Sequence, residues 1–172
     1  DGVPASGITY QWKADGTDIS GATSSTYTLT NAEVGKAITV VANYTDSRST
    51  AETVTSSATG AVTNANDLGS IAITGAATQG QTLSTTITDP DGVPASGITY
   101  QWKADGTNIS GATGATYTLT NAEVGKAITV VANYTDSRSS AETVTSSATS
   151  AVTNTNDAGS IAITGTATQG QT

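Results

Sequence analysis

The chain consists of one sequence that repeats with a period of 90 residues. The string DGVPASGITYQWKADGT starts at Asp1 and again at Asp91, and positions 1–82 align with 91–172 without a gap. Only 8 of the 82 aligned positions differ, and seven of those exchange one small or polar residue for another. Solenoid coils are about 20–50 residues long, whereas a unit of this size can be a domain with its own core. We therefore expect tandem domains.

Two stretches rich in Asn, Asp and Gly predict the linkers of this array, at 64–68 and 155–157. One complete unit then covers 69–154. We expect 1–63 to be a front-truncated copy and 158–172 to be the leading strand segment of a next copy. The chain is accordingly expected to open inside one unit of a longer array and to stop inside another.

Within the unit, apolar and polar residues alternate with a period of two, and a helical period is absent. Ile98, Tyr100 and Trp102, for example, alternate with polar neighbours, which is typical of strands. Gly, Asn and Asp separate these runs. Strands are predicted at 70–75, 81–88, 98–104, 107–110, 115–120, 127–135 and 140–148, with a short helical turn at 122–126. Seven short strands in one unit predict an all-β fold of tandem β-sandwiches.

The large apolar and aromatic residues of these strands are expected to form the core. Those that we single out are Trp12, Tyr44, Trp102, Tyr134, Leu119, Ile128 and Val130. The chain has no Cys, so disulfide bonds and thiolate metal sites are excluded. A unit of this size can bury enough apolar surface to fold without such bonds.

Composition also removes most functional classes. The chain has no His, which excludes Ser-His-Asp triads and imidazole metal sites. Its net charge of −8 argues against nucleic acid and anionic membranes as partners. No apolar run approaches the roughly 18 residues of a membrane helix, and the polar Asp1-Gly2 start predicts no signal peptide. The acidic residues lie mostly in turns, so we predict a protein that is not an enzyme.

The Asp89-Pro90-Asp91-Gly92 turn comes closest to a chemical motif. Two carboxylates two positions apart could offer oxygen ligands to Ca²⁺, which needs six to eight of them. Further ligands would come from the linker, where Asn66 and Asp67 lie beside Asn64. The alternative is an ordinary Pro/Gly turn with solvated carboxylates. The turn therefore has two interpretations. One is a calcium site at Asp89, Asp91, Asn66 and Asp67, and the other is an ordinary turn.

The string ITYQWKADGTNISGAT, followed by TYTLTNAEVGKAITVVANYTD, resembles the immunoglobulin-like repeats of very large bacterial surface adhesins. The resemblance covers the whole unit and recurs in the first copy. It rests on a Trp in the third strand (Trp12, Trp102), the Tyr-Thr-Leu-Thr strand and the Glu-Val-Gly-Lys corner. The immunoglobulin cysteine pair is absent. The resemblance implies immunoglobulin-like sandwiches, export to the bacterial cell surface and a role in attachment or biofilm.

Three functions are compatible with these observations. The first is a spacer, in which sandwiches in series hold a binding domain away from the cell and touch only neighbouring repeats. The second is a filament or matrix fibre, in which one chain donates a leading strand to another copy. The residues of that strand are Ser160, Ile161, Ala162, Ile163 and Thr164. The third is a glycan-binding module, for which the sequence offers only Tyr10/Tyr100 or Tyr27/Tyr117 as exposed aromatic residues.

Overall fold

The computed structural model describes residues 2–4, 7–165 and 167–170. Almost all of its regular structure is β-strand, arranged in three antiparallel sheets. The chain divides into two compact units. The first comprises Asp1–Leu68 with the turns Asp89–Val93 and Asp136–Ser140, and the second comprises Gly69–Thr88, Pro94–Thr135 and Ala141–Thr172.

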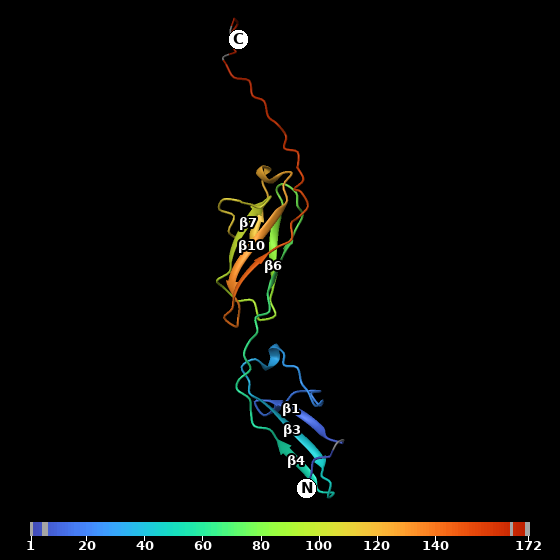
Figure 1. Cartoon of the computed structure of the whole chain (residues 1–172). Helices are drawn as coiled ribbons and strands as arrows, with labels where there is room; N and C mark the ends of the chain where they lie inside the picture. Colours follow the sequence, from blue (N-terminus) through green and yellow to red (C-terminus); the bar gives the residue numbers. More distant parts are fainter. Residues whose placement is uncertain (1, 5–6, 166, 171–172) are drawn as a thin grey trace. The chain divides into compact units, whose positions relative to one another are not determined.

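In the second unit, two antiparallel sheets face each other. One has the strand order β11-β10-β7-β8, and the other has the order β5-β6-β9. The strands are β5 (Ser70–Thr74), β6 (Thr82–Thr88), β7 (Thr99–Ala104), β8 (Thr107–Asn108), β9 (Thr116–Thr118), β10 (Ile128–Thr135) and β11 (Ala141–Thr145), with a 3-10 helix η2 (Asn121–Glu123). Figure 1 shows β6 in the layer that faces β7 and β10. This arrangement is compatible with a β-sandwich.

The core of the second unit lies between these sheets. Leu83 from β6 packs in one cluster with Trp102 from β7 and Val130 from β10, and the side chains of all three are fully buried. The indole N–H of Trp102 donates to the carbonyl of Gly114 at 2.8 Å, so the largest core side chain leaves no polar atom unpaired. The alternation of apolar and polar residues along the strands thus places one face of each sheet in the core.

Each strand predicted for the complete unit has a counterpart, although several are shorter. β11 ends at Thr145 because hydroxyl groups take over the pairing with β10. Ser146 Oγ accepts the Val130 N–H and Thr149 Oγ1 accepts the Ile128 N–H, each at 3.0 Å. These side-chain contacts end the regular ladder while they keep the segment attached to the sheet.

The first unit contains one sheet with the order β2-β1-β3-β4. Its strands are β1 (Thr9–Ala14), β2 (Thr17–Asp18), β3 (Ile38–Thr45) and β4 (Ala51–Thr55), with a 3-10 helix η1 (Asn31–Glu33). The registers repeat those of the second unit: Trp12 lies opposite Val40, just as Trp102 lies opposite Val130. Among its described residues, no second sheet covers this one.

The missing layer changes the burial of otherwise identical residues. Leu119 is 2% exposed in the second unit, but Leu29, which precedes it by 90 positions, is 46% exposed. Val144 and Val54 differ in the same way, at 7% and 45%. Of the predicted core residues, Trp102, Tyr134, Leu119, Ile128 and Val130 are buried, whereas Trp12 and Tyr44 are only half-buried. In the described part of the first unit, the core residues of its one sheet are therefore not covered by a second sheet.

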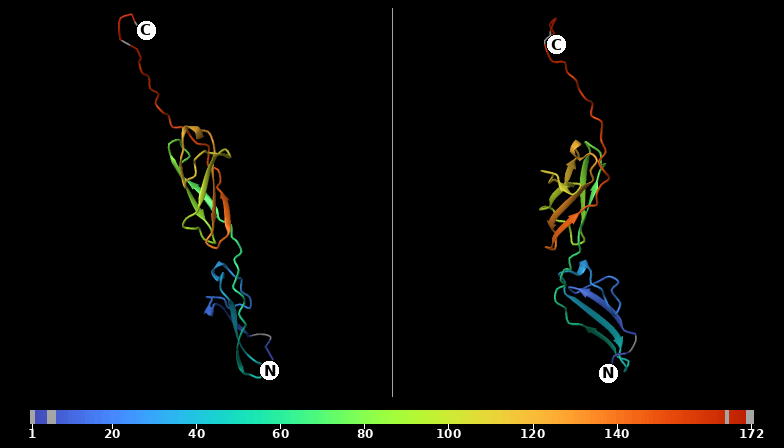
Figure 2. Two further views of the ribbon diagram at one scale, coloured as in Figure 1. Left: turned by 90° about the vertical axis from the view of Figure 1, so that its left-hand side faces the viewer. Right: turned by 45° about the horizontal axis from the view of Figure 1, so that its top comes forward.

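Residues 160–164 form no strand and are exposed; Ile161 and Ile163 are almost completely accessible. Figure 2 shows this segment, in red, as extended chain beyond the strands of the second unit. No helix in the described part of the chain has the length and apolar character of a membrane span.

Candidate functional site

The carboxylate of Asp91 is the most extensively bonded acidic group that the sequence singled out. It is 3% exposed and belongs to the first unit, together with the residues that surround it. Its Oδ2 accepts the backbone N–H of Asp67 at 2.9 Å and the amide Nδ2 of Asn64 at 3.1 Å. Its Oδ1 lies 3.4 Å from Nε of Arg138. Nitrogen donors therefore surround this carboxylate and hold the predicted linker residues against the turn.

These donors lower the pKa of Asp91. The backbone hydrogen bond from Asp67 has the largest effect, followed by the Asn64 side chain, and both outweigh the opposing effect of burial. Because hydrogen bonds to the ionised form stabilise it, Asp91 is a charged structural group at neutral pH.

The other predicted metal ligands, unlike Asp91, are either bonded within their own turn or exposed. Asp89 Oδ1 accepts the backbone N–H of Asp91 at 2.8 Å, which closes the turn on itself. Asn66 and Asp67 are exposed, and Asp67 Oδ2 accepts Nδ2 of Asn31 at 3.0 Å. The structure thus brings Asp67, Asp89 and Asp91 into one hydrogen-bonded region, but N–H groups rather than a cluster of free oxygens fill it.

A second carboxylate lies near Asp89 that the sequence did not single out as a ligand. Asp136, which follows β10, has an oxygen within 4.8 Å of one from Asp89. Its Oδ1 accepts the backbone N–H groups of Arg138 and Ser140, each at 2.8 Å, whereas its buried Oδ2 has no hydrogen-bond partner. An uncompensated buried carboxylate oxygen suits a cation. The calcium interpretation remains a prediction, and Asp89 with Asp136 is the pair on which it rests best.

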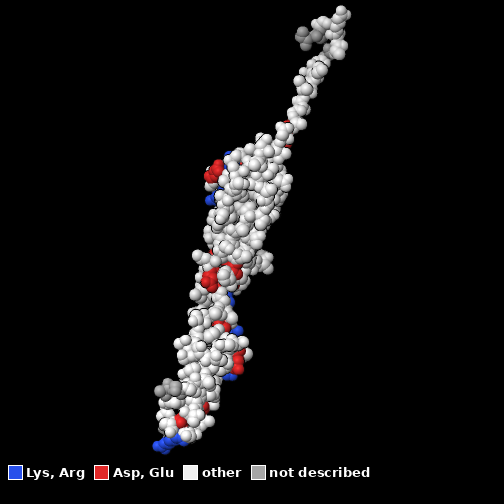
Figure 3. Space-filling view, turned by 90° about the vertical axis from the view of Figure 1, so that its right-hand side faces the viewer, with Lys and Arg blue, Asp and Glu red and all other residues white. Residues whose placement is uncertain are grey.

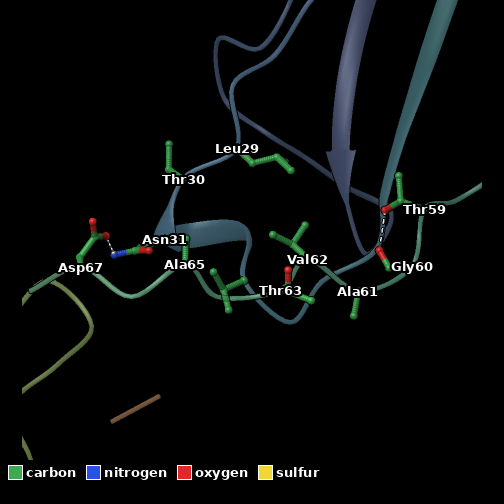
Figure 4. Close-up of a pocket in the computed structure, with 11 residues that line it drawn as sticks. Leu29, Thr30, Asn31, Thr59, Gly60, Ala61, Val62, Thr63, Ala65 and Asp67 are labelled. Atoms are coloured by element: carbon green, nitrogen blue, oxygen red, sulfur yellow. Dashed lines mark hydrogen bonds between the residues drawn. The ribbon is translucent and has the colours of Figure 1, made fainter. Parts of the chain in front are cut away.

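An apolar groove of about 790 Å³ lies in the first unit, between the segment around η1 and residues 59–67. Its apolar lining comes from Leu29, Val34, Ala61, Val62 and Ala65. In Figure 4 the side chains of Leu29 and Val62 point into the same hollow, while Asn31 and Asp67 close one end with their hydrogen bond. A groove of this kind can receive apolar side chains, but it brings no acid, base or nucleophile together.

Two glutamates have a structural role that the sequence pattern Thr-x-x-Glu could have revealed. Thr30 donates its backbone N–H to Glu33 Oε2 at 2.9 Å and its hydroxyl at 2.8 Å, and Thr120 bonds Glu123 in the same way. These hydrogen bonds lower the pKa of Glu33 although burial opposes them. Such capping boxes fix the start of η1 and η2 rather than serve catalysis.

The polypeptide joins and leaves the second unit at opposite ends of β5. At one end, the backbone N–H of Gly69 donates to Glu142 Oε2 at 3.4 Å. Beyond the other end of β5, the backbone N–H of Thr155 donates to the Gln79 side chain at 3.3 Å, and Gln79 also bonds Asp157 at 2.8 Å. The two predicted ends of the complete unit, near Gly69 and Thr155, are therefore hydrogen-bonded to the rest of the unit at separate places.

Charged side chains are sparse over much of the surface. Figure 3 shows small patches of acidic and basic residues on a face that is otherwise uncharged. The positive side chains needed for a nucleic-acid surface are not gathered on this face. Comparison with protein-family models finds no match to this chain, and comparison with curated protein sequences finds no significant match either.

Proposed function

We propose that this chain is a non-catalytic structural part of a bacterial extracellular adhesin, composed of tandem immunoglobulin-like sandwiches, and that it acts as a spacer in surface attachment or biofilm. The observation that carries this proposal is the attachment of the second unit at opposite ends of β5. A unit joined in this way adds its own length to a chain of repeats instead of folding the chain back. The sequence repeat supplies the copies.

The chemistry of the described residues supports a mechanical role. The buried carboxylates of Asp91, Glu33 and Glu123 accept hydrogen bonds within turns and caps, and the groove of the first unit brings no set of catalytic side chains together. The hydrogen bonds of Asp91 with Asn64 and Asp67 hold the predicted linker against a turn of the first unit. Short, bonded linkers limit bending, which a spacer requires.

Electron microscopy of negatively stained protein, together with its solution mass, tests the proposal. A spacer predicts isolated particles of monomer mass that are unchanged by concentration. Filaments would contradict it and would favour the fibre function. Each sample is measured with Ca²⁺ and again with a chelator, so that an effect of the metal is detected separately.

The exposed tail is the specific observation that favours a filament. Ile161 is 98% exposed, whereas Ile71, its counterpart 90 positions earlier, is 7% exposed. An exposed, extended apolar segment can add as a strand to a sheet of another chain. Deletion of 158–172 tests this second candidate: filaments that persist in the deletion variant would exclude strand donation by Ser160–Thr164. The double substitution Ile161→Asp and Ile163→Asp keeps the chain length and is the matched control.

A further inference from the structure

The chain leaves the core of the second unit along a segment that is hydrogen-bonded on both sides. We call residues 152–157 the exit segment. On one side, the N–H of Val152 donates to the carbonyl of Lys126, and the carbonyl of Val152 accepts the N–H of Gly125, each at 2.9 Å. Val152 is 2% exposed and belongs to the core cluster. This side therefore anchors the start of the exit segment in the core.

The other side of the exit segment is held by residues 77–79, and Gln79 makes most of the contacts. Its backbone N–H donates to the carbonyl of Thr153 at 2.9 Å, and its own carbonyl accepts the hydroxyl of Thr155 at 3.2 Å. Its side-chain Oε1 accepts the backbone N–H of Thr155 at 3.3 Å, and its Nε2 donates to Asp157 Oδ2 at 2.8 Å. One glutamine thus bonds three residues of the exit segment.

Thr153 adds further hydrogen bonds beside those of Gln79. Its N–H donates to the carbonyl of Ala77 at 2.9 Å, and its hydroxyl contacts that carbonyl at 3.3 Å and the hydroxyl of Thr78 at 2.9 Å. Thr78 and Thr153 form a parallel bridge, so the two segments run in the same direction. A pull on the chain beyond residue 157 acts along the exit segment and slides it past residues 77–79. Hydrogen bonds in this geometry share the load instead of breaking one after another.

We propose that residues 77–79 and 153–157 form a clamp, with Gln79 at its centre, which fixes the predicted linker 155–157 on the second unit and carries tension out of that unit. This inference deepens the spacer function and rests on it for its purpose. An exposed hydrogen bond adds little to stability by itself, because water competes for the same groups. Because four bonds converge on Gln79, the exit segment has to break them together in order to leave.

Amide hydrogen exchange of the full chain, followed residue by residue by NMR, measures how often the clamp opens. Gln79→Ala removes two side-chain hydrogen bonds, and we expect the amide of Thr153 to exchange about tenfold faster in this variant. The amide of Val130, inside strand β10, is expected to keep its exchange rate. Unchanged exchange at Thr153 would overturn the proposal. An equal acceleration at Val130 would also overturn it, because the whole unit would then have lost stability.

Two further variants locate the effect. Gln169→Ala removes the identical side chain 90 positions later, where it is exposed, and is expected to leave the exchange of Thr153 unchanged. Thr153→Val removes the hydroxyl bonds to Ala77 and Thr78, and it is expected to accelerate the exchange of the Gln79 amide. Equal acceleration by Gln79→Ala and Gln169→Ala, or no acceleration in Thr153→Val, would overturn the proposal.

Single-molecule pulling on the full chain separates the clamp from the spacer function. We expect Gln79→Ala to lower the force at which the second unit unfolds and Gln169→Ala to leave that force unchanged. The same unfolding force in the unmodified chain and in Gln79→Ala would overturn the clamp and leave the spacer function standing. Filaments of the unmodified chain under the electron microscope would contradict the spacer function but not the clamp. Smooth extension of the unmodified chain would overturn both.

Discussion

Asp91 shows how a single buried side chain can hold distant residues together. Its Oδ2 binds Asn64 and the backbone of Asp67, and its Oδ1 faces Arg138. The sequence groups Asp91 with the linker residues as possible calcium ligands, but it does not single out Arg138. Those partners are far away in sequence, and only the fold brings them to one carboxylate.

The lowered pKa of Asp91 predicts an acid-sensitive contribution to stability. The pKa of Asp91 is lowered in the folded state. Its contribution to stability is therefore complete above the unfolded pKa of about 3.9 and is lost as the pH falls through the lower folded pKa. We expect Asp91→Asn to lower the melting temperature at pH 6. Thermal unfolding followed by circular dichroism from pH 6 to pH 2 should show this difference shrink as the pH falls. A difference independent of pH would contradict the role of the charge.

The paired leucines predict how burial determines the effect of one substitution. Leu119→Ala should destabilise the second unit by about 2–5 kcal/mol, because it leaves a cavity in a closed core. Leu29→Ala, at the half-exposed counterpart, should cost less than about 1 kcal/mol. Urea unfolding followed by tryptophan fluorescence measures both variants. Similar losses would mean that Leu29 is as well packed as Leu119.

At the scale of elements, the strands of the second unit follow from the two-residue alternation, and their ends follow from local hydrogen bonds. Residues 26–28 show the limit of this reasoning. Their sequence is identical to that of β9, yet only β9 is a strand, because only β9 has β6 beside it. Strand structure here depends on a partner as much as on propensity.

The turn between β5 and β6 gives a test with an internal control. A Cβ on Gly75 would lie 2.7 Å from the carbonyl of Thr82, and the backbone there has a φ of +113°. Gly75→Ala should therefore destabilise the second unit by about 1–3 kcal/mol. Its counterpart, Gly165, has a similar φ but lies in exposed chain outside any strand and has no atom within 4 Å of the added Cβ, so the backbone there can change conformation and Gly165→Ala should cost less than Gly75→Ala. Denaturant unfolding measures the loss of stability in the two variants. Equal losses would mean that the cost of Gly75→Ala comes from the backbone conformation and not from the contact with Thr82.

At the scale of the whole molecule, the repeat predicted one complete unit, a front-truncated copy and the leading segment of a next copy, but it did not predict that Trp12 and Tyr44 of the truncated copy would be only half-buried. The aligned sequences are almost identical, whereas their cores differ because only one unit has both sheets. The calcium prediction from the Asp89 turn likewise did not include Asp136, whose position beside Asp89 follows from where β6 and β10 end.

Calcium binding near Asp89 can be tested by linkage. A cation that binds only the folded protein at 100 times its dissociation constant adds about 2.7 kcal/mol to stability. We expect Ca²⁺ to raise the melting temperature of the chain, and Asp89→Asn to abolish the increase. Mg²⁺ is the control for ionic strength, and the chelated protein gives the baseline. An equal increase in the Asp89→Asn variant would place the metal elsewhere.

The proposed spacer function requires the second unit to resist a force applied at its two ends. Gly69 and Thr155 are tied at separate places, and a parallel bridge joins Thr78 to Thr153, so tension loads several hydrogen bonds together. Single-molecule pulling between the chain ends measures this directly. We expect an abrupt unfolding step that releases residues 69–154, about 300 Å of extended chain less the folded length. A smooth extension without such a step would contradict it.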